Sequence, residues 1–287
     1  MISAFIGILF DGLAYAMILY IISVGLSVTM GMMGFANLAH GAFAMAGGYV
    51  MVTLMQQLGL PFLATLPLVF VIVAAISVAF ERLLYARLYR AGELDQVLFT
   101  IGLIFMAIAA TTFVWGPLPQ AVRLPPYLMG QVDLGFRTFP TYRTFLIVIG
   151  AVLILALWLG LERTRLGAQV RAAVDNRRMA ESVGINVGRL FTTTFALGSG
   201  LAGLGGALGA DILAPTPSYA LEHLVYFLIV VAVGGMGSIR GPFVAALLLG
   251  VMDTAGKYYV PDFGAFFIYV AMMGLLLWRP HGLFGRA

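Results

Sequence analysis

The sequence lacks cysteine altogether, contains a single lysine and has few charged residues. Only 10% of its 287 residues are charged, whereas 62% are hydrophobic and the mean hydropathy is +1.02. The absence of cysteine excludes a disulfide framework, a thiol nucleophile and a metal site with thiolate ligands. A soluble domain usually has about 25% charged residues. The composition therefore excludes a soluble enzyme or nucleic-acid-binding protein and indicates a chain that lies in a membrane.

Long apolar runs predict the number of membrane crossings. A helix needs about 20 mostly apolar residues to cross the hydrocarbon layer. Two short, glycine-rich runs are candidates for re-entrant or broken helices, so we expect eight to ten transmembrane or re-entrant helices. The expected fold is an all-α polytopic membrane protein in which 1–287 form one transmembrane domain. The predicted crossings lie near 12–30, 41–57 (short), 61–80, 96–117, 144–161, 191–213, 223–238, 241–256 (short) and 263–278.

Basic residues predict the orientation of these crossings. No lysine or arginine precedes Arg82, so the sequence lacks the basic start of a secretory signal peptide. The loop 162–190 contains six arginines, and cytoplasmic loops carry an excess of basic residues. Placing this loop inside predicts an external N-terminus and a cytoplasmic C-terminus. The inside residues are then Arg82, Arg87, Arg90, Arg163, Arg165, Arg171, Arg177, Arg178, Arg189, Arg240, Arg279 and Arg286, and the outside ones are Arg123, Arg137, Arg143 and Lys257.

The longest external loop, 118–143, is rich in proline. We expect it to be an ordered surface loop or to contain short extracellular elements.

Two segments resemble nucleotide-binding motifs, but one has the wrong spacing and the other the wrong structural context. The only lysine, Lys257, follows Gly250 and Gly256, but the first glycine is one residue too distant for a P-loop and Tyr258 replaces the required Ser or Thr. The chain is therefore not expected to hydrolyse ATP by itself. The run from Gly198 to Gly203 fits G-x-G-x-x-G, yet it lies in an apolar helix without a preceding strand. Small residues at every fourth position favour close helix packing instead.

Histidine and acid patterns give no catalytic constellation. The three histidines, His40, His223 and His281, are far apart, and none forms a metal-binding pair. The adjacent Glu222 and His223 are interpreted either as a polar cap at the mouth of a crossing or as substrate contacts. We therefore expect no metal site and no enzymatic activity.

Residues 166–183 are predicted to form a cytoplasmic helix. Arg171 and Asp175 fall on one face, and Gly184 stands where a C-cap glycine is expected. Two interpretations remain open from the pattern alone, an amphipathic helix on the bilayer or a docking helix for a soluble partner. The small or apolar stripe beside the charged face consists of Ala168, Ala172, Met179 and Val183.

Two glycine-rich segments, 31–43 and 234–243, interrupt apolar runs and end in similar triplets. Interrupted helices at corresponding positions of two halves are typical of a transport path. Tight packing of two helices is the alternative interpretation. The candidate path residues are Gly34, Asn37, His40, Gly41, Gly234 and Gly237.

Together these segments resemble the branched-chain amino-acid permeases of ABC importers, most closely the H-subunit type. The resemblance is carried by 31–43, by 167–175 with Ala180 and 184–186, by 234–242 and by the closing 278–285. It implies a translocation path formed with a second related permease subunit. It also implies two cytoplasmic ATPase subunits that hold ATP and Mg²⁺, an external or periplasmic substrate-binding protein, and the inner membrane of a bacterium.

The same resemblance assigns the loop 162–190 to ATPase coupling, with a coupling helix near 166–184. No cofactor is expected on this chain, and lipid but not nucleic acid is expected to contact it. The coupling residues implied are Arg171, Ala172, Asp175, Ala180, Gly184 and Ile185.

Alternatives to branched-chain amino-acid import remain. Related permeases import urea, short amides or aromatic acids, and the core motifs do not separate these substrates. A stand-alone proton-coupled carrier would use Asp211 and Asp253 as relay groups. Both acids lie near predicted crossing ends, which favours interfacial caps.

Overall fold

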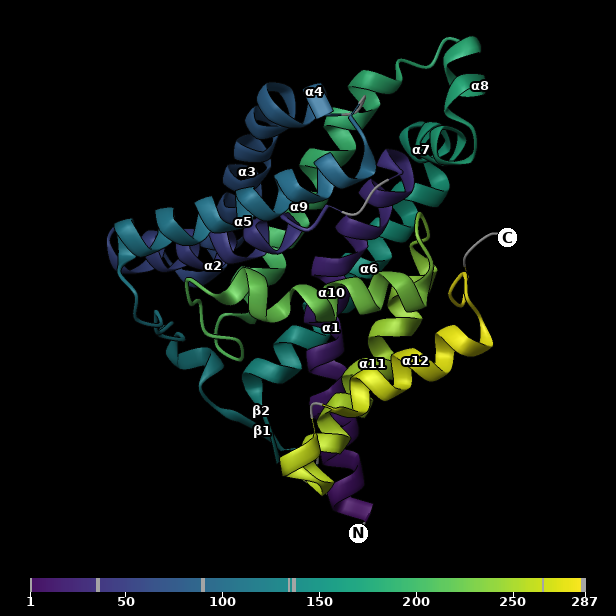
Figure 1. Cartoon of the computed structure of the whole chain (residues 1–287). Helices are drawn as coiled ribbons and strands as arrows, with labels where there is room; N and C mark the ends of the chain where they lie inside the picture. Colours follow the sequence, from purple (N-terminus) through teal and green to yellow (C-terminus); the bar gives the residue numbers. More distant parts are fainter. Residues whose placement is uncertain are drawn as a thin grey trace.

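The computed structural model describes residues 2–34, 37–88, 91–133, 135, 138–264 and 266–284. Helices make up almost all of its regular structure (Figure 1). The elements are α1 (Ile2–Met33), α2 (His40–Gln56), α3 (Phe62–Phe80), η1 (Glu81–Tyr85), α4 (Ala86–Leu88), α5 (Glu93–Trp115), η2 (Pro126–Leu128), β1 (Gln131–Asp133), β2 (Thr138–Pro140), α6 (Thr141–Arg163), α7 (Arg165–Asp175), α8 (Arg177–Ser182), α9 (Val187–Gly209), α10 (Tyr219–Gly234), α11 (Arg240–Tyr259), η3 (Pro261–Phe263) and α12 (Phe266–Trp278).

The predicted all-α polytopic fold is confirmed. Within the described residues, nine helices have 13 or more residues, and each overlaps one predicted crossing. Four helical stretches are long and apolar enough to span a membrane alone, namely Ala4–Met32, Phe62–Leu88, Glu93–Trp115 and Thr141–Arg163.

The two short, glycine-rich runs are not broken helices. Residues 41–57 lie almost wholly in the continuous helix α2, and 241–256 lie inside α11. The chain instead leaves helical conformation just before each of them. Gly34 and Gly237, both with φ +75°, stand at these two breaks. Glycine tolerates this left-handed region without a Cβ penalty, so the interruption precedes the helix.

Close backbone contacts hold α9 at the centre, against α1, α2 and α3. A Cβ added to Gly47 of α2 would lie 1.9 Å from the carbonyl oxygen of Gly203, and one added to Gly25 of α1 would lie 2.3 Å from that of Gly198. Neither site has room for a side chain. The packing interpretation of the Gly198–Gly203 motif is therefore confirmed, because small residues let helix backbones approach closely in lipid.

The predicted cytoplasmic segments gather at one end of the molecule. Figure 1 places α4, α7 and α8 at this end and the N-terminus with the β1–β2 hairpin at the other. Arg240 pairs with Glu162 at 3.0 Å, which ties the α10–α11 connection to the end of α6. Arg143 pairs with Asp11 in the opposite half. The grouping agrees with the predicted orientation, although Arg90, Arg137 and Arg286 lie outside the described residues.

The loop 118–143 contains the short elements that the sequence suggested, η2 and the antiparallel β1–β2 hairpin. Two hydrogen bonds attach its start to the bundle. The Gln56 side chain donates to the carbonyl of Ala121 at 2.8 Å. The backbone N–H of Gln120 donates to the carbonyl of Pro215 at 2.9 Å. The loop is thus ordered against the end of α2 and the connection between α9 and α10.

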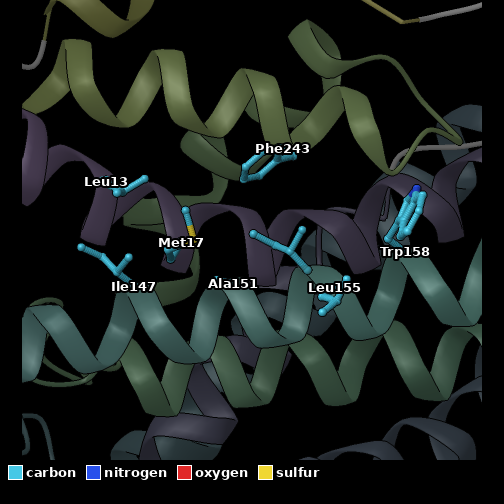
Figure 2. Close-up of a pocket in the computed structure, with 8 residues that line it drawn as sticks. Leu13, Met17, Ile147, Ala151, Leu155, Trp158 and Phe243 are labelled. Carbon is cyan, nitrogen blue, oxygen red and sulfur yellow. The ribbon is translucent and has the colours of Figure 1, made fainter.

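α6 is the least buried of the four long spans. Only 11% of its most apolar window is buried, against 67% for α1. An apolar groove of about 360 Å³ opens on this side between α1 and α6. Because its lining is almost entirely apolar, the groove suits a lipid chain or another apolar helix better than a charged solute. It is bordered by Leu13, Met17, Ile147, Leu155 and Phe243 (Figure 2).

Candidate functional site

The predicted helix over 166–183 is wrong in one respect, since it is two helices. Asn176 is extended (φ −155°, ψ 100°) and separates α7 from α8. Its side-chain oxygen accepts a hydrogen bond from the Met179 amide at 3.0 Å, so it acts as an N-cap for α8. The predicted C-cap is confirmed, because Gly184 has φ +86° and the Ile185 amide donates to the Ala180 carbonyl at 3.0 Å.

The predicted coupling residues divide between two faces of this loop. Arg171, Asp175 and Gly184 are exposed, and Ala172 is half-buried. Ala180 is buried and Ile185 half-buried, so both face the bundle rather than solvent. They pack in a small satellite core made of Val28, Leu166, Val170, Ala173, Val174, Ala180, Ile185, Val187, Leu190 and Ile239, among others.

The apolar stripe beside the charged face does not pack on the bundle. Met179 and Val183 are 63% and 71% exposed, Ala168 is exposed and Ala172 half-buried. We call Met179, Val183 and the exposed Arg178 the α8 surface. An apolar pair bordered by charge and left uncovered at the end of a bundle is typical of an interaction site.

The buried face of α7 joins the two glycine-rich segments. A Cβ on Gly31 would lie 2.4 Å from the Cα of Gly237, and a Cβ on Gly237 would lie 2.9 Å from Cγ1 of Val174. The Gly237 amide donates to the carbonyl of Ser27 at 2.9 Å, and the Ser27 hydroxyl donates to that of Ser238 at 2.8 Å. We call Gly31, Val174 and Gly237 the Val174 junction. It connects α7 to the last turns of α1 and to the helix break at Gly237, a contact that the sequence did not predict.

Two of the predicted path residues form a buried polar centre. Asn37 and His40 are 0% and 1% exposed. The Tyr85 hydroxyl donates to the Asn37 side-chain oxygen at 2.9 Å, and His40 Nε2 donates to the carbonyl of Ile22 at 3.0 Å. Among the described residues, Asn37 Nδ2 and His40 Nδ1 have no hydrogen-bond partner. Buried polar groups left unsatisfied are costly. These two atoms are among eight buried side-chain atoms of the described residues that lack a partner.

Tyr85 was missed by sequence reasoning. It ends η1, a π-helical turn over Glu81–Tyr85. Such turns are rare and concentrate at functional sites, but no single-sequence pattern marks them. At the other end of the turn, buried Glu81 accepts a hydrogen bond from the Thr192 hydroxyl at 2.8 Å.

The predicted glycines of the path have different surroundings. Gly34 is exposed and a Cβ there would touch nothing within 4 Å. A Cβ on Gly41 would lie 3.0 Å from the carbonyl oxygen of Ala220, and one on Gly234 would lie 2.4 Å from the nitrogen of Pro242. The geometry at Gly41 and Gly234 supports close packing, the alternative left open above.

The two acids of the carrier alternative differ in burial. Asp253 is 1% exposed within α11 and accepts a hydrogen bond from Lys257 Nζ at 2.6 Å. Asp211 follows α9 and is exposed, and partial burial raises the pKa of its carboxyl while Arg143 opposes this shift. The two acids therefore belong to separate environments.

Glu222 and His223 lie in the first turn of α10. The Ser218 hydroxyl donates to Glu222, and His223 Nδ1 lies 3.1 Å from the carbonyl oxygen of Tyr219. These local contacts support the polar-cap interpretation. In the part of the chain that the structure describes, no group of three His, Asp or Glu side chains is placed to hold a metal ion.

Comparison with known proteins decides the family. The family described as branched-chain amino acid transport system / permease component matches residues 8–276. The chain belongs to this family. This permease is 26% identical to the high-affinity branched-chain amino acid transport system permease protein BraD of Pseudomonas aeruginosa, over 97% of this chain and 95% of BraD. It is also 25% identical to a probable branched-chain amino acid transport permease protein LivH of Methanocaldococcus jannaschii, over 97% and 92% of the two chains.

A second type of relative and one solved structure extend this result. The permease is 27% identical to the LivM permease protein of Escherichia coli, over 93% of this chain and 68% of LivM. Its fold is similar to a chain of PsaBC from Streptococcus pneumoniae in complex with Fab, with a TM-score of 0.52, 16% identity and coverage of 96% and 94%. That likeness concerns the fold alone.

Proposed function

We propose that this permease is one of two related membrane subunits of an ABC importer for branched-chain amino acids in a bacterial inner membrane. The family match over residues 8–276 carries the proposal. The chain is similar both to proteins named LivH or BraD and to proteins named LivM, which suggests a second, related permease as its partner. An external or periplasmic protein binds the amino acid and delivers it to the outer loops.

Energy for transport comes from two separate ATPase subunits on the cytoplasmic side. The single lysine of this chain lies outside any P-loop, so ATP and Mg²⁺ are held by those partners. The α8 surface, with exposed Arg171, Asp175 and Gly184 beside it, supports docking of the ATPases there. Ala172 lies at the edge of this face, while Ala180 and Ile185 position α8 on the bundle.

The buried polar centre is the proposed polar part of the translocation path. A branched-chain amino acid needs an apolar route with a few polar contacts for its charged ends. Asn37 Nδ2 and His40 Nδ1 offer such contacts once the helices move apart. ATP can shift the balance between outward-open and inward-open states only through its different affinity for them. No covalent chemistry is assigned to this chain.

Replacing Asn37 or His40 with alanine is expected to lower leucine uptake about tenfold, the loss that corresponds to one contact with a charged group. Uptake of radiolabelled leucine by cells with matched expression measures this. His281→Ala is the control, because His281 is exposed at the C-terminal end and lies away from the centre in sequence. Normal uptake in both Asn37→Ala and His40→Ala would remove these residues from the path.

Transport by the purified complex in vesicles tests the energy source. With ATP on the ATPase face and binding protein on the other, we expect leucine transport that stops when ATP is omitted. Transport that continues without ATP would favour the proton-coupled carrier and make Asp211 and Asp253 the residues to mutate. Competition by urea, short amides or aromatic acids, without competition by leucine, would reassign the substrate within the same family.

A further inference from the structure

A cavity of about 330 Å³ lies at the predicted cytoplasmic end, outside the polar centre. Its walls come from η1 and α4 on one side and from α8 and the first turns of α9 on the other. Three charged side chains line it, Glu81, Arg82 and Arg177, together with the apolar Val187 and Phe191. The cavity therefore combines both signs of charge with an apolar wall.

The charged groups differ in burial. Glu81 is 3% exposed and its Oε2 accepts the Thr192 hydroxyl at 2.8 Å, so its carboxylate is fixed at the inner wall. Arg82 and Arg177 are exposed at the rim. Arg177 contacts Glu181 at 3.1 Å, and Arg82 makes no ion pair with any residue that the structure describes. A ligand entering from the cytoplasm meets two guanidinium groups before it reaches the carboxylate.

We propose that this cavity binds a zwitterionic α-amino acid with an aliphatic side chain, the class of molecule that the permease imports, from the cytoplasmic side. The ligand carboxylate lies between Arg82 and Arg177, where guanidinium groups bind carboxylates well. The ammonium group faces Glu81, and the aliphatic side chain lies against Val187 and Phe191. The volume is near the lower limit of ordinary ligand pockets, about 300 Å³, which suits an amino acid better than a nucleotide.

Binding here has a mechanical consequence that rests on the proposed function. The ligand would join Arg82 of η1 to Arg177 of α8, and α8 carries the surface proposed to meet the ATPase. The same π-helical turn holds Tyr85, whose hydroxyl contacts Asn37 in the polar centre. An amino acid that accumulates in the cytoplasm thereby holds α8 against η1 and slows further import. The site is a product-inhibition site.

Phosphatidylethanolamine headgroups share this chemistry, since they combine an anionic phosphate with an ammonium group. The binding experiment separates the two sources. It uses the purified permease–ATPase complex without binding protein, in nanodiscs of phosphatidylcholine only, and measures equilibrium binding of radiolabelled L-leucine. We expect saturable binding that soluble phosphoethanolamine does not displace. If phosphoethanolamine displaces the labelled leucine at a concentration below the leucine concentration in the assay, the cavity binds a lipid headgroup. This result would overturn the proposal.

Two variants and one control locate the bound leucine. Arg82→Gln removes one carboxylate contact, and Ala86→Leu narrows the cavity that Ala86 also lines. Each is expected to weaken leucine binding about tenfold. Arg87→Gln, an exposed arginine of the same segment that does not line the cavity, is expected to bind like the wild type. Absence of saturable binding to the wild type, or equal binding to Arg82→Gln, would overturn the proposal.

The transport consequence is measured in proteoliposomes whose ATPases face outward, with binding protein and labelled leucine enclosed. Unlabelled leucine added outside with ATP is expected to slow export of the label severalfold for the wild type and Arg87→Gln, but not for Arg82→Gln. A wild type that transports with ATP and ignores external leucine contradicts this inference alone. A wild type that does not transport under ATP contradicts the proposed function instead.

Discussion

Gly206→Val is expected to prevent the permease from folding. Gly206 lies in the buried half of α9, where an added Cβ would come 1.9 Å from the carbonyl oxygen of Ala44 in α2. Atoms cannot approach so closely, and the neighbour is backbone, which has no rotamer to escape into. α2 and α9 would have to separate, and with them the contacts that α9 makes to α1 and α3. Size-exclusion chromatography of a fluorescent fusion should show loss of the monodisperse peak.

Gly102→Val is the matched control for this substitution. Gly102 is also a helical glycine in a membrane-spanning segment, but a Cβ there meets nothing within 4 Å. Its variant is expected to give a normal peak and a melting temperature within about 3 °C of the wild type, as for surface substitutions elsewhere. A normal peak for Gly206→Val would contradict the close approach of α2 and α9. Loss of the monodisperse peak for both variants would mean that a larger side chain in any membrane-spanning helix prevents folding.

Val174→Ala and Val183→Asp are expected to separate coupling from docking. Val174 lies at the junction with Gly31 and Gly237, whereas Val183 belongs to the exposed α8 surface. Shortening Val174 should leave the ATPases bound but lower the leucine transported per ATP hydrolysed about tenfold, within the usual range of coupling energies. Val183→Asp should release the ATPases, because it replaces an apolar contact with a carboxylate that has no partner in the interface.

Co-purification and the ratio of transport to ATP hydrolysis measure the two effects on the same membranes. Ala168→Asp introduces a second charge on the loop 162–190, placed on α7 instead of α8. If Val174→Ala transports and hydrolyses ATP in the wild-type ratio, the Val174 junction does not transmit movement. If Val183→Asp retains its ATPases as well as the wild type does, docking takes place elsewhere.

The spans could be predicted because hydropathy over about 20 residues depends only on local composition. Within the loop 162–190, the C-cap at Gly184 was also predictable, since a glycine directly after a helical pattern commonly ends the helix. The interruption at Asn176 was missed, although asparagine is among the strongest N-cap residues. Helical periodicity through 166–183 concealed it, because both halves keep small residues at helical spacing. The inward orientation of Ala180 and Ile185 followed from this break.

Contacts between residues far apart in the sequence limited how much of the functional site could be predicted. Asn37 and His40 stood out as polar residues in an apolar run, so their importance was visible from the sequence. Tyr85, the hydrogen-bond partner of Asn37, is 48 positions away from it, and only the fold brings the two together. The same holds for Gly31 and Gly237, which lie in the two glycine-rich segments that were identified separately. Their contact through Val174 depends on how α7 folds back onto the bundle.

The central claim is that this chain works as one permease of a multisubunit ABC importer. Affinity purification from native membranes in mild detergent, followed by mass spectrometry of the co-purifying chains, tests it most directly. We expect a second apolar permease of the same family and two copies of P-loop ATPase, in one or two forms, with the Val183→Asp variant losing the ATPases. A chain that purifies alone from native membranes, and still transports leucine in ATP-free vesicles, would contradict the claim.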